Sequence, residues 1–256
     1  MLTNKVAIIT GASRGIGLAT ARALIVEGAQ VYAISRSDLP IEAIASGIIQ
    51  IKADLREPEQ IEQVVQTILE QVGTIDILVN NAGVETFKPF LEATLEEYDQ
   101  MIDTNLRGAL LCTRAVLPTM IARRSGHLVF INSVSGLRGF AMDSVYCASK
   151  HALTGLAEAL DEELRPQGVR VCSIHPGATA TQLSVDSWAP AEDARRPYFL
   201  KPADVAQAVV FALKQPPHVV ISQIVLRPLI EPVYSDFLPV ELASDLIRAG
   251  QAPSGG

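Results

Sequence analysis

Short apolar runs alternate along the chain with segments whose apolar residues recur every three or four positions. The runs are typical of buried strands, and the recurring pattern is typical of helices that pack on a sheet. Strands are expected at 5–9, 30–34, 48–52, 75–79, 126–131, 169–174 and 219–226. Helices are expected at 15–27, 58–72, 146–164 and 202–213, with one long helix or two abutting helices at 95–124. This alternation predicts one α/β domain.

Residues 182–200 interrupt the pattern, because they show no clear period. A long irregular segment inside a compact domain is usually functional, so we expect a substrate lid there. The domain is expected to span residues 1–228. A tail, 229–256, follows it, and its last residues, 252–256, are expected to be disordered.

Composition narrows the class of protein. Of the 256 residues, 48% are hydrophobic and 19% are charged, which is ample for a buried core. No apolar run approaches the ~20 residues that cross a bilayer, and the first residues leave no room for a signal peptide. The net charge of -7 argues against nucleic-acid binding, and Cys112, Cys147 and Cys172 lack metal or disulfide spacing. We therefore expect a cytoplasmic protein without membrane, nucleic-acid or metal partners.

A glycine-rich turn joins the first expected strand to the first expected helix. Glycines allow backbone angles and close approaches that a Cβ would block, so a pyrophosphate can sit on the helix N-terminus. A second strand follows at once, and no Lys-Ser/Thr pair follows the glycines, which speaks against a P-loop. The expected cofactor contacts of this turn are Gly11, Ser13, Arg14, Gly15, Ile16 and Gly17.

The residues after the second strand indicate which dinucleotide binds. Folds that prefer NAD usually place an acidic residue there, whereas this chain has Ser35-Arg36-Ser37. Arg14 and Arg36 could clamp a 2′-phosphate, which favours NADP(H) over NAD(H). The alternative is that both arginines simply face solvent.

Later strand ends supply further candidate contacts. Asp54, beside Leu55, could reach an adenine amino group or simply form a turn. Asn81, Ala82 and Gly83 are small or amide-bearing, which suits a backbone that passes close to a flat ring. The turn after the sixth strand carries hydroxyls that could meet an amide or a phosphate. Its candidates are Pro176, Gly177, Thr179 and Thr181.

Tyr146 and Lys150 are four residues apart in an expected helix, so both side chains lie on one face. A cation beside the phenol lowers the tyrosine pKa, which makes Tyr146 a usable general acid or base. The alternative is a packed tyrosine beside a solvated lysine. Ser133 follows the fifth strand at its carboxyl end, where α/β folds place their sites. Asn105 either binds backbone carbonyls or holds a water on a proton path from Lys150.

Together these motifs resemble the short-chain dehydrogenase/reductase family over residues 3–228. In family order, they are TGxxxGIG at 10–17, NNAG at 80–83, Asn105, Ser133, YxxxK at 146–150 and PG at 176–177. Ser133 stands thirteen positions before Tyr146, the family's usual spacing, and is preferred to Ser135 for that reason. The resemblance implies a doubly wound, Rossmann-like parallel sheet of seven strands with helices on both faces.

The resemblance also implies a role for each catalytic residue. Tyr146 would give its proton to a substrate carbonyl oxygen as hydride arrives, and Ser133 would hydrogen-bond that oxygen. Lys150 would lower the pKa of Tyr146 and bind the nicotinamide ribose, while Asn105 would order a relay water. Hydride addition builds negative charge on oxygen, so a proton donor and a preorganised dipole are both needed.

Two segments depart from the family pattern. Many members end the last strand in Val-Asp-Gly-Gly, which contributes to tetramer contacts, and this chain has other residues at 219–228. A homodimer therefore stands beside a homotetramer as the expected assembly. Residues 38–47 are short for a family helix, so they either open one sheet face or tighten a loop.

The expected substrate is a medium-sized, partly apolar ketone or secondary alcohol. One alternative is a 3-oxoacyl-carrier-protein reductase, which the departure in the last strand weakens. Another is a catalytically silent dinucleotide sensor, which would not need all four catalytic residues. Arg138 could meet a substrate carboxylate or face solvent, and His151 and His175 receive no role. The pocket candidates are Val84, Phe87, Val134, Leu137, Phe140, Met142, Leu183, Trp188, Tyr198 and Phe199.

Overall fold

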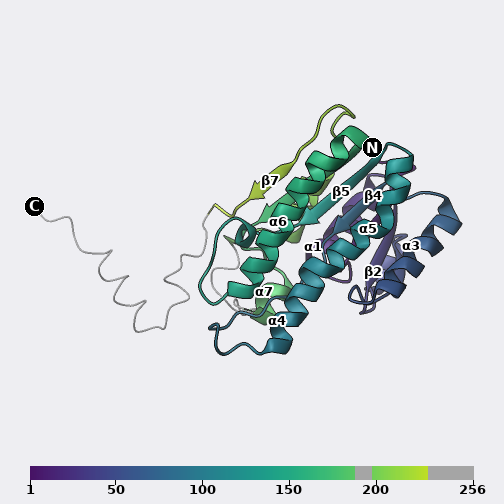
Figure 1. Ribbon diagram of the computed structural model, residues 1–256. Helices are drawn as coiled ribbons and strands as arrows, with labels where there is room; N and C mark the ends of the chain where they lie inside the picture. Colours follow the sequence, from purple (N-terminus) through teal and green to yellow (C-terminus); the bar gives the residue numbers. More distant parts are fainter. Residues whose placement is uncertain (188–197, 230–256) are drawn as a thin grey trace, which may run out of the picture.

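A computed structural model describes residues 1–187 and 198–229 of the chain. It contains a seven-stranded parallel sheet of order β3-β2-β1-β4-β5-β6-β7, with helices around it (Figure 1). The predicted doubly wound sheet is therefore confirmed. Its strands are β1 (Val6–Thr10), β2 (Gln30–Ser35), β3 (Ile49–Lys52), β4 (Ile77–Asn80), β5 (Gly126–Ile131), β6 (Val169–Pro176) and β7 (Gln223–Leu226).

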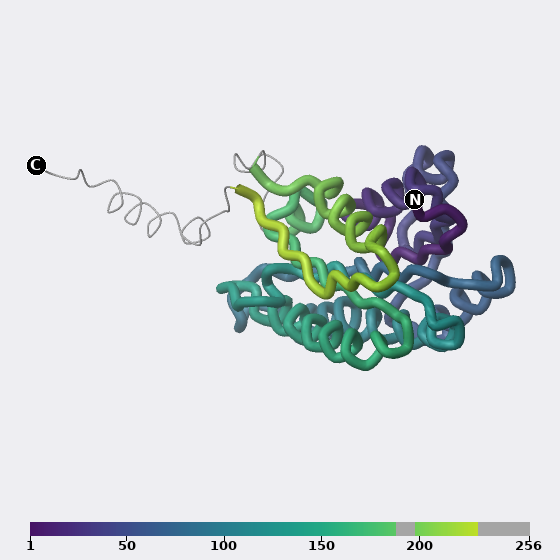
Figure 2. The backbone as a smooth tube through the Cα atoms, turned by 90° about the horizontal axis from the view of Figure 1, so that it is seen from above, coloured from purple at the N-terminus to yellow at the C-terminus, as the bar shows by residue number. Residues whose placement is uncertain are grey.

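Helices pack against both faces of the sheet, and Figure 2 shows the strands between the two layers. Alternate residues of each central strand enter different cores: Ile9 and Val79 face one layer, whereas Ile8 and Leu78 face the other. Burial on both faces explains why these strands read as continuous apolar runs. One layer holds α1 (Gly15–Val26), α2 (Ile41–Ala45) and α8 (Pro202–Leu213), and the other holds α3 (Pro58–Val72), α5 (Gly108–Ala122) and α6 (Ser144–Leu164).

The strand order reverses at β1, which pairs with β2 on one side and with β4 on the other. In open parallel sheets, the carboxyl ends of the strands around such a reversal form a crevice that binds ligands. The turns that carry the predicted site residues all follow the carboxyl ends of β1, β2, β3, β4, β5 and β6. The topology therefore gathers them at one edge of the sheet.

The long helical segment is neither one regular helix nor two separate ones. α4 (Leu95–Ile102) runs into a π-helical turn at Asp103–Arg107, and α5 continues from that turn. The start of α4 is set by a capping box, in which Thr94 and Glu97 satisfy each other's backbone N–H groups. Asn105 lies inside the π-helical turn, and such turns are frequent at functional sites.

Two expected boundaries change in the structure. Residues 182–187 are not irregular but form α7 (Gln182–Ser187), because the hydroxyls of Thr181 and Ser184 bond the backbone groups at its start. Of the rest of the expected lid, 188–197 lie outside the described residues, as does the tail from 230 onward, whereas 198–200 are described and Leu200 pairs with Thr179 in an isolated β-bridge. The last strand begins at Gln223 rather than at 219, since a turn bonds Val219 N to Pro216 O at 2.9 Å.

The short segment 38–47 covers the sheet rather than opening it. Leu39 and Ala43 are buried in the same core as Val31 and Ala33 of β2. Five residues of helix are enough there because α2 contributes a single fully buried side chain, Ala43. The tightened connection therefore keeps this edge of the apolar core closed.

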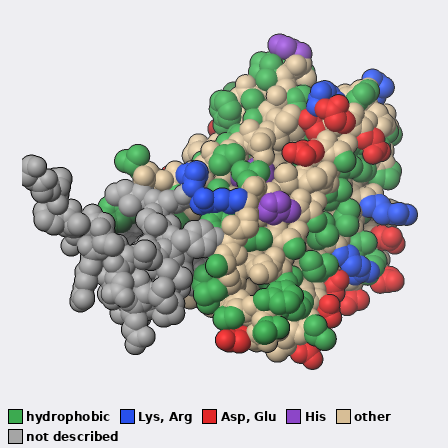
Figure 3. Space-filling model, turned by 60° about the vertical axis from the view of Figure 1, so that its left-hand side comes forward, with side chains coloured by type: hydrophobic (Ala, Val, Ile, Leu, Met, Phe, Trp, Pro, Cys, Tyr) green, Lys and Arg blue, Asp and Glu red, His purple; other side chains and the backbone are tan. Residues whose placement is uncertain are grey.

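The described surface has mixed charge. On the face drawn in Figure 3, acidic and basic side chains are interspersed, and no continuous basic area is visible there among the residues drawn in colour. A face without a continuous basic area agrees with the net charge of -7. None of the helices in the two described ranges is long and apolar enough to cross a bilayer.

Candidate active site

The glycine turn after β1 is locked to the turn after β4. Asn81 Nδ2 donates to the carbonyls of Thr10 (2.8 Å) and Gly11 (3.1 Å), and Thr10 Oγ1 accepts from the backbone N–H groups of Asn81 and Ala82, both at 3.0 Å. A Cβ on Gly17 would lie 2.4 Å from Asn81 Nδ2, and one on Gly11 would lie 2.8 Å from Ala82 Cα. These glycines thus allow two turns of the protein itself to touch.

A cavity of about 420 Å³ opens above these interlocked turns. Gly11 and Gly15 have φ values of +64° and +57°, which favour glycine, and the side chain of Arg14, the N-cap residue, does not bond the first N–H groups of α1. A glycine cradle at an uncapped helix N-terminus fits a pyrophosphate, so the residues present suit a dinucleotide. The predicted contacts that line it are Gly11, Ser13, Arg14, Gly15, Ile16, Arg36, Asp54, Leu55, Asn81, Ala82, Gly83, Tyr146, Lys150 and Thr181.

Two expected groups of cofactor contacts lie elsewhere. Gly17 lines neither cavity of the site, because it packs against Asn81 and the carbonyl of Gly11. Pro176, Gly177 and Thr179 line a second, smaller cavity and not the larger one. The turn after β6 therefore contributes to the dinucleotide cavity through Thr181.

Arg14 and Arg36 reach the rim of the larger cavity with loosely held guanidinium groups. Their side chains are 64% and 56% exposed, and their nearest acids lie 3.7 Å away at Asp186 and 3.8 Å away at Asp54, respectively. Asp54 itself is held by Arg56, with Nη2 to Oδ2 at 2.6 Å, and this hydrogen bond keeps the pKa of Asp54 below its usual value. Asp54 also accepts from Arg56 N, as expected of a turn residue.

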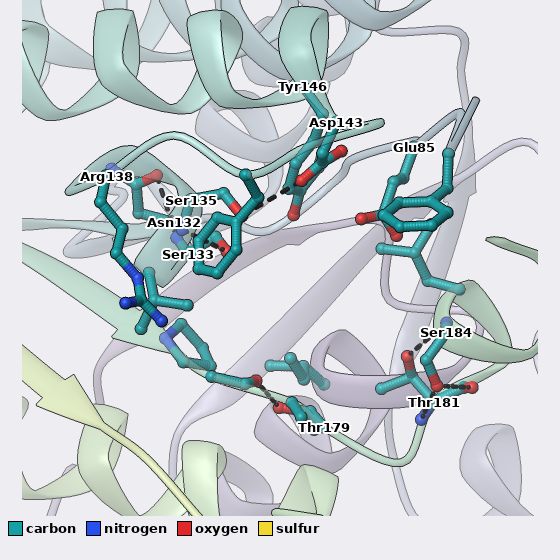
Figure 4. Close-up of a pocket in the computed structure, with 18 of the residues that line it drawn as sticks. Glu85, Asn132, Ser133, Ser135, Arg138, Asp143, Tyr146, Thr179, Thr181 and Ser184 are labelled. Atoms are coloured by element: carbon teal, nitrogen blue, oxygen red, sulfur yellow. Dashed lines mark hydrogen bonds between the residues drawn. The ribbon is translucent and has the colours of Figure 1, made fainter. Parts of the chain in front are cut away.

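Figure 4 shows the smaller cavity, of about 170 Å³. It meets the larger one at Tyr146, which lines both. Its apolar lining includes four of the predicted pocket residues, Phe87, Val134, Phe140 and Leu183. Val84 lines the larger cavity instead, and Trp188 lies outside the described residues. The remaining candidates, Leu137, Met142, Tyr198 and Phe199, line neither cavity. Arg138 lines the smaller cavity, with its guanidinium carbon 4.6 Å from the centre of the Phe140 ring.

Tyr146 is only 7% exposed, and its pKa is raised well above the usual value. Burial is the main cause, and the acidic groups of Glu85 and Asp143 add to it, whereas a hydrogen bond with the Ser133 side chain acts in the opposite direction. The net shift of the Tyr146 pKa is therefore upward, opposite to the lowering expected beside Lys150. Burial disfavours the phenolate more than a single nearby amine can compensate.

Lys150 is 3% exposed and stands beside the tyrosine ring, with Nζ 5.5 Å from the ring centre. Its ammonium donates to the carbonyl of Ile131, at 3.1 Å, and burial lowers its pKa to about 8. The same burial that raises the tyrosine pKa thus weakens the lysine charge. The two groups nevertheless share one helix face, as the four-residue spacing predicts.

Asn105 bonds the backbone after the fourth strand with both ends of its amide. Oδ1 accepts from Val84 N at 2.8 Å, and Nδ2 donates to Val84 O at 2.9 Å and to Ser149 Oγ at 3.1 Å. Ser149 Oγ in turn donates to the carbonyl of Tyr146 at 2.7 Å. The side chain of Asn105 therefore binds backbone groups and ties the loop at Val84 to the helix that carries Tyr146.

The backbone of Ser133 is supported by a histidine to which the sequence assigns no role. His175 is fully buried, and its Nδ1 donates to Ser133 O at 3.0 Å while its Nε2 accepts from Gln223 Nε2 at 3.0 Å. Burial lowers the histidine pKa, which keeps the ring neutral and the two roles distinct. The serine hydroxyl itself accepts from Ser135 N at 3.0 Å.

Two acids of the smaller cavity are absent from the sequence predictions. Glu85 follows the NNAG motif by two positions, and Asp143 precedes Tyr146 by three. The signal for Asp143 was its spacing, since a residue three positions before Tyr146 lies on the same side of a helix start. No periodic pattern marks Glu85, because it lies in the irregular chain after β4.

Known proteins match this chain over most of its length. The sequence pattern of the family described as "short chain dehydrogenase" matches residues 5–192. An uncharacterised oxidoreductase of Staphylococcus saprophyticus is 37% identical over 236 residues, which cover 89% of this chain and 98% of that protein. Another, from Staphylococcus aureus strain USA300, is 35% identical over 233 residues, covering 89% and 99%.

Two solved structures are similar in fold and sequence. A metagenomic short-chain oxidoreductase in complex with NADP has a TM-score of 0.76 and 34% identity, covering 90% of this chain and 99% of that one. A serine dehydrogenase complexed with NADP+ has a TM-score of 0.81 and 31% identity, covering 89% and 96%.

Proposed function

Because the chain belongs to the short-chain dehydrogenase family, we propose that it is an NADP(H)-dependent oxidoreductase acting on a carbonyl group or a secondary alcohol. The observation that carries the proposal is the position of Tyr146, a buried acid at the junction of a dinucleotide-sized cavity and a mostly apolar one. A medium-sized, partly apolar substrate suits the smaller cavity. In this arrangement, a bound nicotinamide dinucleotide would supply or accept the hydride.

The residues around Tyr146 then handle the proton. A phenol with a raised pKa keeps its proton near neutral pH, so Tyr146 holds the proton that a substrate carbonyl oxygen receives. Ser133 orients the same phenol and offers a second hydrogen bond to the oxygen that gains charge. After the transfer, the ammonium of Lys150 lies beside the phenolate and stabilises it.

The preference for NADP(H) rests on Arg14 and Arg36. Both line the larger cavity, neither is tightly paired, and Ser35 and Ser37 stand where an acid would select NAD. The two solved relatives that carry NADP support the same choice. We assign Gly11, Ser13 and Gly15 to the pyrophosphate and Lys150 to the nicotinamide ribose.

The test is a panel of ketones and secondary alcohols, including 3-oxoacyl thioesters and free 3-hydroxy acids, assayed with both cofactors. We expect NADPH oxidation with at least one ketone and slower turnover with NADH. Tight NADPH binding without turnover on any member would favour a silent sensor. Turnover restricted to oxoacyl thioesters would favour the carrier-protein reductase.

We also propose that the protein is a homodimer or a homotetramer. The segment around the start of α4 exposes large apolar side chains, with Phe90 at 58%, Leu91 at 94% and Leu95 at 76%. Neighbouring exposed apolar side chains of this size are typical of interaction sites. Light scattering coupled to size exclusion would give the mass directly, and a monomer would contradict the proposal.

A further inference from the structure

Asp143 is a buried acid in the wall of the smaller cavity that the proposed proton transfer does not use. Its side chain is 4% exposed, and Figure 4 shows it beside Tyr146 and facing Ser135. Oδ2 accepts from Ser135 Oγ at 3.3 Å and from Cys147 Sγ at 3.7 Å. Oδ1 is buried and has no hydrogen-bond partner among the residues that the structure describes.

A buried carboxyl oxygen without a partner is costly, because it has lost its hydrogen bonds to water and gained none in exchange. Ser135 and Cys147 already occupy the other oxygen with long hydrogen bonds. Asp143 lines the cavity, and Oδ1, which its surroundings cover in the structure, is the carboxyl oxygen without a partner. Contact with a polar group of the molecule that Tyr146 protonates therefore requires the carboxyl to turn toward the cavity.

We propose that Asp143 recognises a hydroxyl group that the substrate carries close to its reacting carbonyl, so that the preferred substrates are hydroxy ketones and the corresponding diols. This inference rests on the proposed function, because it takes Tyr146 as the proton donor. The apolar wall formed by Phe87, Val134 and Phe140 would contact the carbon chain of such a substrate.

Other polar groups fit this position less well. A substrate carboxylate would face Asp143 and Glu85 together, which disfavours it, although Arg138 lies at the same cavity. A substrate ammonium would pair only with the ionised acid and would lie near Lys150, whose charge opposes it. A hydroxyl both donates and accepts, so it can pair with either form of the acid. Burial raises the pKa of Asp143 to about 7, so both forms are present near neutral pH.

The experiment compares kcat/KM for acetoin with kcat/KM for butanone, with NADPH, in the wild type and in three variants. Asp143→Leu removes the acid at similar volume, Asp143→Ala removes it without adding bulk, and Asp143→Asn keeps one acceptor and serves as the matched control. The ratio of the two kcat/KM values is taken within each protein, so the fraction of folded enzyme cancels. The thermal midpoint is measured with and without butanediol or butan-2-ol as a readout of binding.

We expect the wild type to prefer acetoin by about tenfold or more, since a hydrogen bond to a charged group contributes that much. The preference should vanish in Asp143→Leu and Asp143→Ala and persist in Asp143→Asn, and butanediol should raise the wild-type midpoint more than butan-2-ol does.

Equal kcat/KM values for the two ketones in the wild type, or a preference that survives in both Leu and Ala variants, would overturn the inference. A preference for aminoacetone or acetoacetate over acetoin would overturn it in favour of an ammonium or carboxylate. Absence of turnover on every ketone would instead count against the proposed function.

Discussion

The two cavities that meet at Tyr146 are built in different ways. The dinucleotide cavity rests on turns that hold each other through backbone carbonyls, backbone N–H groups and the side chains of Thr10 and Asn81. The smaller cavity is lined mainly by side chains from the segment after β5, α6, the turn after β6 and the chain after β4. Backbone geometry therefore determines the first cavity, whereas side-chain chemistry determines the second. A substitution in the dinucleotide cavity should mainly affect cofactor binding or stability. A substitution in the smaller cavity should mainly affect the rate of the reaction.

The largest expected effect is at the junction itself. Tyr146→Phe removes the proton donor and keeps the ring, so turnover of an accepted ketone should fall by about a hundredfold to ten-thousandfold, the usual contribution of general acid catalysis. NADPH binding, measured by fluorescence titration, should change little. Tyr98→Phe is the control, because that hydroxyl bonds Phe90 O on the surface around α4. Full activity in Tyr146→Phe would contradict the mechanism.

A comparison of two helical glycines tests the backbone origin of the larger cavity. Gly17→Ala would place a Cβ 2.5 Å from the carbonyl oxygen of Gly11, whereas a Cβ on Gly155 meets nothing within 4 Å. We expect Gly17→Ala to lower the free energy of unfolding by about 1–3 kcal/mol and to weaken NADPH binding. Gly155→Ala should raise it by up to about 1 kcal/mol, because alanine favours the helix. Urea denaturation measures both, and equal effects would show that the interlocked turns can relax.

The arginine pair separates the two dinucleotides. Arg36→Ala should weaken NADPH binding by about tenfold, as expected for one lost charge-assisted contact, and should leave NADH binding nearly as it was. The effect on NADPH should shrink as salt is added, because the guanidinium is exposed. Arg22→Ala, on the exposed side of α1, serves as the charge-matched control. If NADPH and NADH lose affinity equally, the arginine does not read the 2′-phosphate.

The smallest expected effect is a pH dependence of stability. The pKa of Asp143 is raised from 3.8 to about 7 in the folded protein, so the folded state binds the proton more tightly than the unfolded state. The stability that this group contributes is complete below pH 4 and is lost as the pH rises through 7. Asp143→Asn should therefore gain stability relative to the wild type between pH 6 and pH 7.5, by about 1 kcal/mol.

Thermal unfolding at several pH values measures this difference. Glu85, Tyr146, Cys147 and Lys150 are the titratable groups around Asp143. The pKa of Lys150, lowered to about 8, acts in a separate range above neutrality, so the two groups can be told apart. A stability difference between variant and wild type that stays constant with pH would show that Asp143 is ionised throughout.

The amino-acid sequence by itself determined the architecture and most of the dinucleotide cavity. Strands buried on both faces leave continuous apolar runs, and glycines that must approach another backbone cannot be replaced, so both features are readable locally. Arg14 and Arg36 were predicted from their places after the first two strands, and Tyr146 and Lys150 from their four-residue spacing. The structure brings all four to the larger cavity. The sequence did not predict the π-helical turn at 103–107 or the short helix at 182–187. Neither shows in the apolar pattern, and the short helix begins with hydrogen bonds between Thr181 and Ser184.

Only the tertiary structure decided how the charges in the site behave. Spacing placed Lys150 beside Tyr146 and suggested a lowered tyrosine pKa, but the pKa is raised, because burial acts on both groups and depends on everything packed around them. The same holds for Asp143, whose position three residues before Tyr146 is visible in the sequence. Its burial and the different surroundings of its two oxygens arise from the packing of α6 against the segment that follows β5.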